Sequence, residues 1–304
     1  MHLVSAAAEP SSDPSIDRPI FCLGVPRSGT TLTLAMMACH PQLAWASQFT
    51  NRVPTRPELA FYSRILDLDP IRRRLPAGSA VTPRPSEPYV LLNHLTDHTF
   101  TEPRLLDAED VTPEVAARFR RSVRAHIHWQ GKSRYLQKHT GFPRTAYLQA
   151  IFPDGRFVHI LRDGRAVAAS LTRVGFFDGT EDSWWWGSMR AEYEEEYLRS
   201  GKSAIVLAAI TWKTLVDLIE PAMAALPPGQ GMTMRYDDLL ARPEETIEDV
   251  GRFCGLELVP SFWDRMRLIR VSGSDDKWKQ LPSEERRLLE ASLGGHLQRL
   301  GFPV

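Results

Sequence analysis

Residues 19–38 read PIFCLGVPRSGTTLTLAMMA, and this segment sets the expectations for the rest of the chain. The short apolar run 20–23 is typical of a buried parallel strand, and the apolar-rich run 32–38 is typical of a helix. Between them lies the glycine-containing loop 24–31. A strand, a loop and a helix in this order aim backbone N–H groups and a helix N-terminus at one point, and this arrangement binds phosphate.

The loop has the spacing of a P-loop, GxxxxGK[ST], with one substitution. Gly24 and Gly29 are the two glycines and Thr31 is the hydroxyl residue, but Thr30 stands where the lysine is expected. That lysine normally reaches the β- and γ-phosphates of a nucleoside triphosphate. The sequence therefore favours binding of a shorter phosphate group over ATP or GTP hydrolysis, with Arg27 supplying the positive charge. On the loop alone, an ordinary strand-to-helix turn in another α/β protein is an equal alternative.

Composition limits the location and the partners of the protein. The chain has 304 residues, of which 43% are hydrophobic, and 37 basic residues balance 37 acidic ones. No overall field favours nucleic acid, so an anion site must be local. The three cysteines lack metal-ligand spacing and are expected to be small core residues. No signal peptide and no membrane span is recognisable, so we expect a cytoplasmic protein with a flexible N-terminal tail at 1–18.

The remaining chain alternates strand-like and helix-like runs. Strands are predicted at 20–23, 135–139, 156–161 and 231–236, and helices at 57–66, 113–130, 145–152, 166–173, 204–226 and 243–253. Thr112 is placed to cap the helix at 113–130. The pattern predicts the α/β class, as one P-loop-like three-layer domain over 19–304 with a central, mainly parallel sheet. The span 41–130 is expected to be a largely helical insertion that covers the crevice and shapes a second substrate's pocket.

Two further runs stand out in the sequence. Arg72-Arg73-Arg74 is expected to be a solvated face. Trp184-Trp185-Trp186 cannot share one helix face, so we expect at least one of the three tryptophans to contact a ligand, a partner or a lid.

Four segments, in this order, resemble motifs of the sulfotransferases that use 3′-phosphoadenosine 5′-phosphosulfate (PAPS), especially the bacterial members. They are PRSGTT at 26–31, LRDGRAVAAS at 161–170, MRYDDL at 234–239 with the following ARPEETIEDVGRFCGLEL, and DKWKQLPSEE at 276–285. The similarity covers roughly residues 18–40 and 134–304, and the four motifs together are highly specific. The insertion at 41–130 does not closely match the animal cytosolic enzymes.

The resemblance implies transfer of a sulfuryl group from PAPS to a hydroxyl or amine, with release of adenosine 3′,5′-bisphosphate and without a metal. The implied nucleotide contacts are Pro26, Arg27, Ser28, Gly29, Thr30 and Thr31 for the 5′-phosphosulfate, Arg162 and Ser170 for the 3′-phosphate, and Tyr236, Lys277, Trp278 and Lys279 elsewhere. The charges of PAPS fit the two predicted sites, because PAPS has two separate anionic clusters and needs two anion sites. Both predicted sites follow strands, where an open α/β sheet binds its ligands.

The sequence offers several candidates for the catalytic residues. Arg27 and Lys138 are candidates for stabilising the transferring group. His139 is slightly favoured as the general base, although family members place one residue between the lysine and the histidine, and a one-residue shift on a strand reverses the face. Glu87, held between two prolines, is the rival, and His94 is a third candidate.

Other functions remain open at this point. A P-loop kinase would use ATP and Mg²⁺, and a non-catalytic nucleotide-binding module would keep both phosphate sites without a working base. If the protein is a sulfotransferase, its acceptor can be a small molecule, a carrier-bound substrate, or a glycan or lipid. Neither the acceptor nor the oligomeric state can be inferred from the sequence.

Overall fold

A computed structural model describes residues 16–68, 82–271 and 275–303. Its centre is a five-stranded sheet in the order β2-β3-β1-β4-β5, and all four neighbouring pairs are parallel. The strands are β1 (Ile20–Gly24), β2 (Leu43–Trp45), β3 (Arg134–Thr140), β4 (Arg156–Leu161) and β5 (Gly231–Arg235). The predicted α/β fold with a mainly parallel sheet is confirmed.

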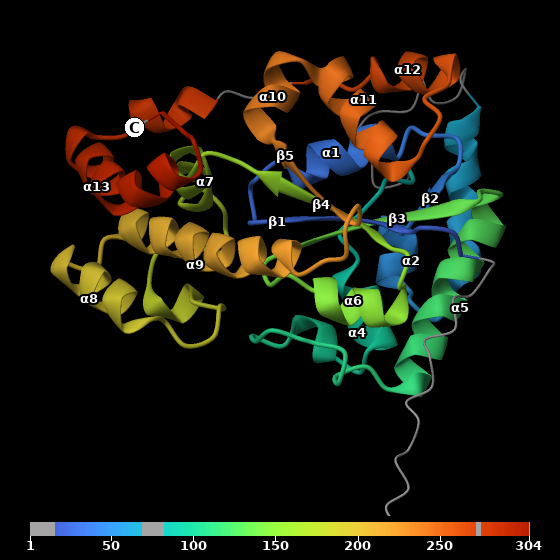
Figure 1. The fold of residues 1–304 in the computed structure, drawn as a ribbon, viewed down its shortest axis with the longest axis horizontal. Coiled ribbons are helices and arrows are strands. Elements are labelled where there is room, and N and C mark those ends of the chain that lie inside the picture. Colours follow the sequence, from blue (N-terminus) through green and yellow to red (C-terminus); the bar gives the residue numbers. More distant parts are fainter. Residues whose placement is uncertain (1–15, 69–81, 272–274, 304) are drawn as a thin grey trace, which may run out of the picture.

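Helices cover both faces of the sheet (Figure 1). They are α1 (Thr30–Met37), α2 (Gln48–Arg52), α4 (Tyr89–Leu95), α5 (Pro113–Gln130), α6 (Thr145–Ile151), α7 (Gly164–Leu171), α8 (Ala191–Arg199), α9 (Ala204–Ala224), α10 (Tyr236–Ala241), α11 (Pro243–Cys254), α12 (Pro260–Met266) and α13 (Ser283–Arg299), with 3₁₀ helices η1 (Pro57–Asp67), η2 (Thr99–Thr101), η3 (Glu181–Ser183) and η4 (Asp275–Gln280). Helices α1, α10, α11 and α12 lie on one face, and α5, α6 and α9 pack on the other.

Side chains of the central strands alternate between two apolar cores, one on each face of the sheet. In β1, Phe21 and Leu23 pack toward α6 and α9, whereas Ile20 and Cys22 pack toward α1 and α11. This alternation is the period of two that every strand imposes. All five residues of β1 are buried, which explains why the run reads as continuously apolar.

The insertion contains one strand that the sequence pattern did not reveal. Leu43–Trp45 forms β2 and pairs in parallel with Arg134–Leu136 of β3 at the edge of the sheet. A run of three residues is too short to show a period. The helix predicted at 113–130 is confirmed as α5, and Thr112 caps it by accepting a hydrogen bond from the Val115 N–H at 3.3 Å.

Several other expectations concern the ends and the surface of the chain. The three cysteines are buried and free, as expected. The tail predicted at 1–18 lies outside the described residues up to residue 15, and Ile16 is buried in the core on the α9 side. The Arg72-Arg73-Arg74 run also lies outside the described residues. Within the described ranges, no helix has both the length and the apolarity needed to cross a membrane.

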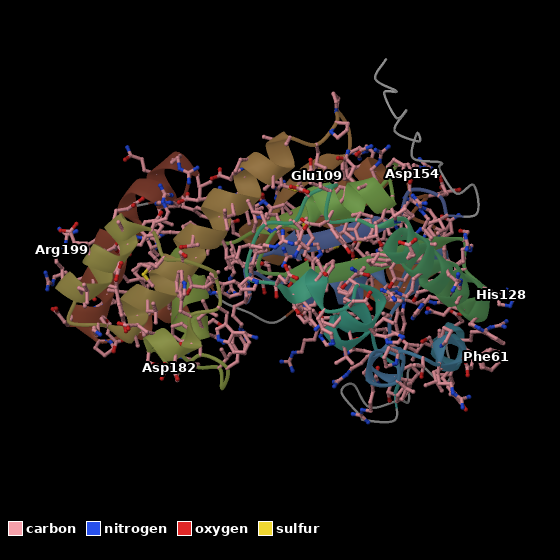
Figure 2. All side chains as sticks on the ribbon, turned by 90° about the horizontal axis from the view of Figure 1, so that it is seen from below. Phe61, Glu109, His128, Asp154, Asp182 and Arg199 are labelled. Carbon is pink, nitrogen blue, oxygen red and sulfur yellow. The ribbon has the colours of Figure 1, made fainter. Side chains whose placement is uncertain are left out.

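The molecule is elongated, with α8 and α13 at one end and α5 at the other (Figure 1). Figure 2 places Asp182 and Arg199 toward one end, and Phe61 and His128 toward the other. The first end is built by η3 and α8, and the second by η1 and the end of α5. The loop after β1 lies between these ends, where segments from both halves of the chain meet.

Candidate active site

At one position, the loop after β1 has a backbone conformation that favours glycine. Gly29 precedes α1 with φ 96°, and a Cβ there would lie 2.2 Å from the ring of Tyr236. The preceding Ser28 is buried, and its Oγ has no hydrogen-bond partner. Because a helix N-terminus also leaves backbone N–H groups without intrahelical partners, this loop offers several donors to an anion.

Lys138 brings to this loop the ammonium group that the sequence lacks at position 30. It lies on β3 opposite Cys22, is only 5% exposed, and donates from Nζ to Thr31 Oγ1 at 2.9 Å. The Nζ atom also lies 3.4 Å from Thr30 Oγ1. The parallel register between β1 and β3 therefore places a lysine where a P-loop has its own.

A second group of polar side chains lies on the other side of the loop. Arg27 Nε donates to Ser170 Oγ at 3.0 Å, and Arg162 donates to the Arg27 carbonyl oxygen at 2.8 Å. The Arg162 guanidinium also stacks 4.5 Å from the centre of the Tyr236 ring. The structure thus brings together four of the predicted nucleotide residues, and it directs the Arg27 side chain toward Ser170.

A cavity of about 500 Å³, here called the loop cavity, lies against these groups. It is lined by Pro26, Arg27, Gly29, Thr30, Thr31, Leu32, Ala35, Glu87, Lys138, Thr140, Arg162, Phe176, Tyr236 and Arg270. Five of its residues were not predicted, namely Leu32, Ala35, Thr140, Phe176 and Arg270. Of these, Phe176 and Arg270 lie in no recognisable motif, and only the folded chain brings them to the loop.

The three residues predicted from the late segment do not line the loop cavity. Trp278 packs on α7, where the Arg165 guanidinium lies 4.5 Å from its ring centre. Lys279 is exposed and pairs with Asp276, and Lys277 is exposed. These contacts make Trp278 a packing residue that joins η4 to α7, and residues 272–274 next to η4 lie outside the described ranges.

Glu87 lies beside the loop, at the edge of the insertion. Its Oε2 is 2.9 Å from Lys138 Nζ, and its Oε1 accepts a hydrogen bond from Thr140 Oγ1 at 2.8 Å. The Tyr89 hydroxyl lies 2.9 Å from the same Oε1 and accepts from the Thr140 N–H at 3.0 Å. Three partners therefore hold this carboxylate in one orientation. Tyr89 and Thr140 were not predicted, although Tyr89 lies two residues after Glu87 and Thr140 directly follows His139 in the sequence.

His139 faces the opposite side of β3 from Lys138. Its side chain is 1% exposed, both ring nitrogens lack a hydrogen-bond partner, and the ring packs edge-on against Phe100. Burial, with the nearby charges of Arg144 and Lys138, lowers its pKa to about 3. The imidazole is thus neutral at physiological pH and a weak base. His94 is exposed on α4. It lines neither the loop cavity nor the second cavity that adjoins it.

A second cavity, of about 550 Å³, adjoins the first and is here called the aromatic cavity. It is lined by Pro26, Glu87, Tyr89, Asn93, Phe100, Thr101, His139, Thr140, Phe142, Arg144, Leu171, Phe176, Phe177, Ser183, Trp185, Trp186 and Thr211. Pro26, Glu87, Thr140 and Phe176 line both cavities. The two spaces therefore meet beside the Glu87 carboxylate.

The run of three tryptophans forms part of the aromatic cavity. Trp186 packs against Gly141, where a Cβ would lie 2.7 Å from its ring, and against Phe142. Trp185 lines the cavity but remains 65% exposed. Trp184 instead donates from Nε1 to the Gly187 carbonyl oxygen. Two of the three rings face a space large enough for a small molecule.

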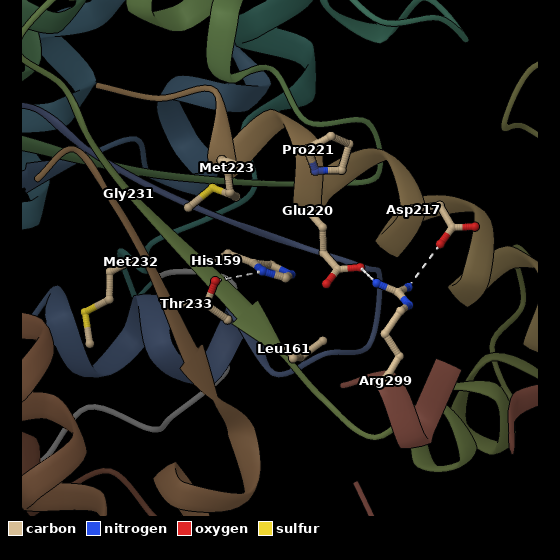
Figure 3. Close-up of a pocket in the computed structure, with 11 residues that line it drawn as sticks. His159, Leu161, Asp217, Glu220, Pro221, Met223, Gly231, Met232, Thr233 and Arg299 are labelled. Carbon is tan, nitrogen blue, oxygen red and sulfur yellow. Dashed lines mark hydrogen bonds and ion pairs between the residues drawn. The ribbon is translucent and has the colours of Figure 1, made fainter. Parts of the chain in front are cut away.

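A third cavity, of about 640 Å³, lies between α9 and β5 and shares no residue with the other two (Figure 3). Its charged groups are paired with one another, since Arg299 contacts both Glu220 and Asp217. His159 Nδ1 lies 3.4 Å from Thr233 Oγ1. Among the described residues, no group of three or more His, Cys, Asp or Glu side chains could hold a metal ion.

Fold and site together define a class: an α/β domain with a lysine-free P-loop, a second arginine-serine cluster, and an adjoining aromatic cavity. A sequence model of the sulfotransferase family matches residues 19–260, and the chain belongs to that family. No curated protein matches the chain.

Solved structures of bacterial sulfotransferases share the fold. Sulfotransferase STF9 from Mycobacterium avium matches with a TM-score of 0.58 and 14% identity, over 95% of this chain and 78% of that one. Sulfotransferase STF1 from Mycobacterium tuberculosis H37Rv matches with a TM-score of 0.50 and 19% identity, over 92% of this chain and 77% of that one. At these identities the likeness concerns the fold alone.

Proposed function

We propose that this protein transfers a sulfuryl group from PAPS, bound in the loop cavity, to a hydroxyl or amine of a small molecule in the aromatic cavity. The observation that carries the proposal is the contact between Glu87 and Lys138 at the point where the two cavities meet. A base and an acid placed together between a donor site and an acceptor site are what group transfer to a hydroxyl requires.

Lys138 and the loop are proposed to bind the 5′-phosphosulfate. Ser28 Oγ, which lacks a partner, and the first N–H groups of α1 fit an oxyanion. As the sulfur–oxygen bond to the phosphate breaks, the leaving phosphate oxygen keeps the electron pair. Lys138 and the loop N–H groups stabilise that negative charge, which is the role of preorganised donors in catalysis.

Arg162, Ser170 and Arg27 are proposed to bind the 3′-phosphate. The three residues form one connected cluster, because the Arg27 side chain donates to Ser170 Oγ and the Arg162 side chain donates to the Arg27 backbone carbonyl oxygen. Arginine stays ionised at any working pH and matches phosphate geometry with two parallel donors. Tyr236, stacked on Arg162, then flanks the adenosine portion.

Glu87 is proposed as the general base in place of His139, which the sequence slightly favoured. The carboxylate accepts the proton of the acceptor hydroxyl while the acceptor oxygen forms its bond to sulfur. Glu87 lines both cavities, and its side chain keeps 23% exposure, so an acceptor can reach it. His139 is a poorer base because burial lowers its pKa to about 3.

The test is a transfer assay with ³⁵S-labelled PAPS, EDTA and a panel of phenols, aliphatic alcohols and amines. We expect labelled product and adenosine 3′,5′-bisphosphate from at least one acceptor, and far less product from Lys138→Met at saturating nucleotide. Absence of transfer to every acceptor, together with phosphorylation of the panel from ATP and Mg²⁺, would replace the proposal with a kinase. Nucleotide binding without any transfer would leave a binding module.

A further inference from the structure

We infer that the acceptor carries a carboxylate, which Arg144 binds inside the aromatic cavity. The inference rests on the proposed function, because it names the acceptor class of that same site. It starts from Arg144, which the sequence did not single out and which lies just before α6. The Arg144 side chain lines the cavity although the residue is only 3% exposed.

The Arg144 guanidinium uses only some of its hydrogen-bond donors within the protein. One terminal nitrogen donates to the Arg104 carbonyl oxygen at 2.5 Å, and the other donates to the Glu102 carbonyl oxygen at 2.6 Å. A guanidinium has five N–H groups, so these two bonds leave three without a partner among the described residues. Backbone carbonyls orient the group, but they carry no charge to neutralise it.

No carboxylate among the described residues forms an ion pair with Arg144. The carboxylates of Glu102 and Asp110 raise the pKa of Arg144 only at a distance, because they are paired with Arg104 at 2.7 Å and 2.6 Å. A buried cation without an ion-pair partner is costly. Burial lowers the pKa of Arg144 to about 10, so the guanidinium still carries its charge at neutral pH.

The rest of the aromatic cavity supplies no other cation to an acidic ligand. Of its lining residues, Arg144 alone is a lysine or arginine, and His139 is neutral. The rings of Phe100 and Phe142 lie 5.7 Å and 5.3 Å from the Arg144 guanidinium. A carboxylate there would receive parallel N–H donors inside an apolar wall, where charge-assisted hydrogen bonds are strongest.

These features define an acceptor with three parts. A hydroxyl reaches Glu87 at the junction of the two cavities, an apolar body packs on the aromatic rings, and a carboxylate reaches Arg144. The acceptor class is therefore a hydroxy acid with an aromatic or aliphatic body. Neutral alcohols of the same shape lack the third contact.

Binding of matched pairs tests this inference without any sulfuryl transfer. The pairs are 4-hydroxyphenylacetate with 4-hydroxyphenylacetamide, and 3-hydroxydecanoate with 3-hydroxydecanamide, each titrated calorimetrically in the absence of PAPS. We expect at least one acid to bind about 10-fold or more tightly than its amide, the ratio that one charge-assisted contact supports. The two pairs distinguish an aromatic from an aliphatic body.

Variants of Arg144 test whether this side chain causes the preference for the acid over the amide. Arg144→Gln should reduce the acid-to-amide ratio to near one, and Arg144→Lys should retain part of it. Arg120→Gln is the matched control, because Arg120 also donates to a backbone carbonyl, that of Ile151, but does not line the cavity.

Equal binding of acid and amide in both pairs, no binding of either acid, or an unchanged ratio in Arg144→Gln would overturn the inference. If Arg144→Gln does not fold, the wild-type ratio and Arg144→Lys decide. Because these measurements use no nucleotide, they can fail while the transfer assay succeeds, and the reverse is also possible.

Discussion

At the scale of single residues, Lys138 and His139 show how one strand serves two purposes. Lys138 faces the loop after β1 and meets Glu87 at 2.9 Å, whereas His139 faces Phe100 on the other side of the sheet. Successive side chains of a strand point to opposite faces, so Lys138 lines the loop cavity, whereas His139 lines only the aromatic cavity. Glu87, which contacts Lys138 and lines both cavities, is therefore our proposed base.

Replacement of the two candidate bases should give unequal results. Glu87→Gln removes the proton acceptor but keeps the shape, so we expect kcat to fall by about 10²-fold to 10⁴-fold with little change in nucleotide affinity. His139→Gln should have a much smaller effect on kcat and should act mainly on stability, because the imidazole is buried. The check is steady-state kinetics together with nucleotide titration. The reverse ranking would return the base to His139.

Arg162 gives a prediction about the second anion site. Arg162→Ala should weaken binding of adenosine 3′,5′-bisphosphate by about 1.5–3 kcal/mol, the range for a hydrogen bond to a charged group. Binding of adenosine 5′-phosphosulfate, which has no 3′-phosphate, should barely change. Calorimetric titration of both ligands measures the difference. Equal weakening of the two would move Arg162 out of the 3′ site.

At the scale of elements, the unit formed by β1, its loop and α1 depends on the conformation of Gly29. Gly29→Ala places a Cβ against the Tyr236 ring at φ 96°, a conformation that L side chains rarely adopt. We expect a loss of about 1–3 kcal/mol in the free energy of unfolding, with weaker nucleotide binding. Denaturant unfolding and titration measure the two quantities.

Gly295→Ala is the control for that substitution, since nothing lies within 4 Å of a Cβ there and the residue is inside α13. Alanine in a helix interior should leave stability unchanged or raise it by about 0.5–1 kcal/mol. Equal stability of the Gly29 and Gly295 variants would show that the loop tolerates a side chain at Gly29.

Four of the five strands and several helices could be predicted from the sequence, because their signals are local, whereas α8, α12 and α13 were not predicted. The apolar run of β1, the capped helix at 113–130 and the P-loop spacing each lie within a few residues of one another. The strand Leu43–Trp45 was not predicted, because a run of three residues is too short to show a periodic pattern. The site was harder, because Lys138, Glu87 and Arg144 come from separate segments. Which side chains meet is decided by the register between β1 and β3 and by the fold of the insertion.

At the scale of the whole molecule, four buried histidines among the described residues couple stability to pH. Burial lowers the pKa of His159 to about 4 and that of His139 to about 3, and it also lowers the pKa of His126 and of His40. The unfolded chain binds protons near pH 6.5, where the folded chain cannot, so stability falls as pH drops below that value. His159 and His139 should each remove about 2 kcal/mol between pH 7 and pH 5.

Urea unfolding across that range measures the effect. His159→Asn should reduce the fall in the free energy of unfolding, because the substituted side chain takes up no proton. A free energy of unfolding that is the same at pH 7 and pH 5 would mean that the histidines are protonated in the folded state.

The central claim is that the loop cavity holds a nucleotide with two separate anionic ends and without a metal. Calorimetric titration with adenosine 3′,5′-bisphosphate in the presence of EDTA tests it most directly, with ATP and Mg²⁺ as the competing ligand. We expect adenosine 3′,5′-bisphosphate to bind in EDTA, and to bind more tightly than ATP with Mg²⁺. Tight binding of ATP with Mg²⁺, with none of adenosine 3′,5′-bisphosphate, would contradict it.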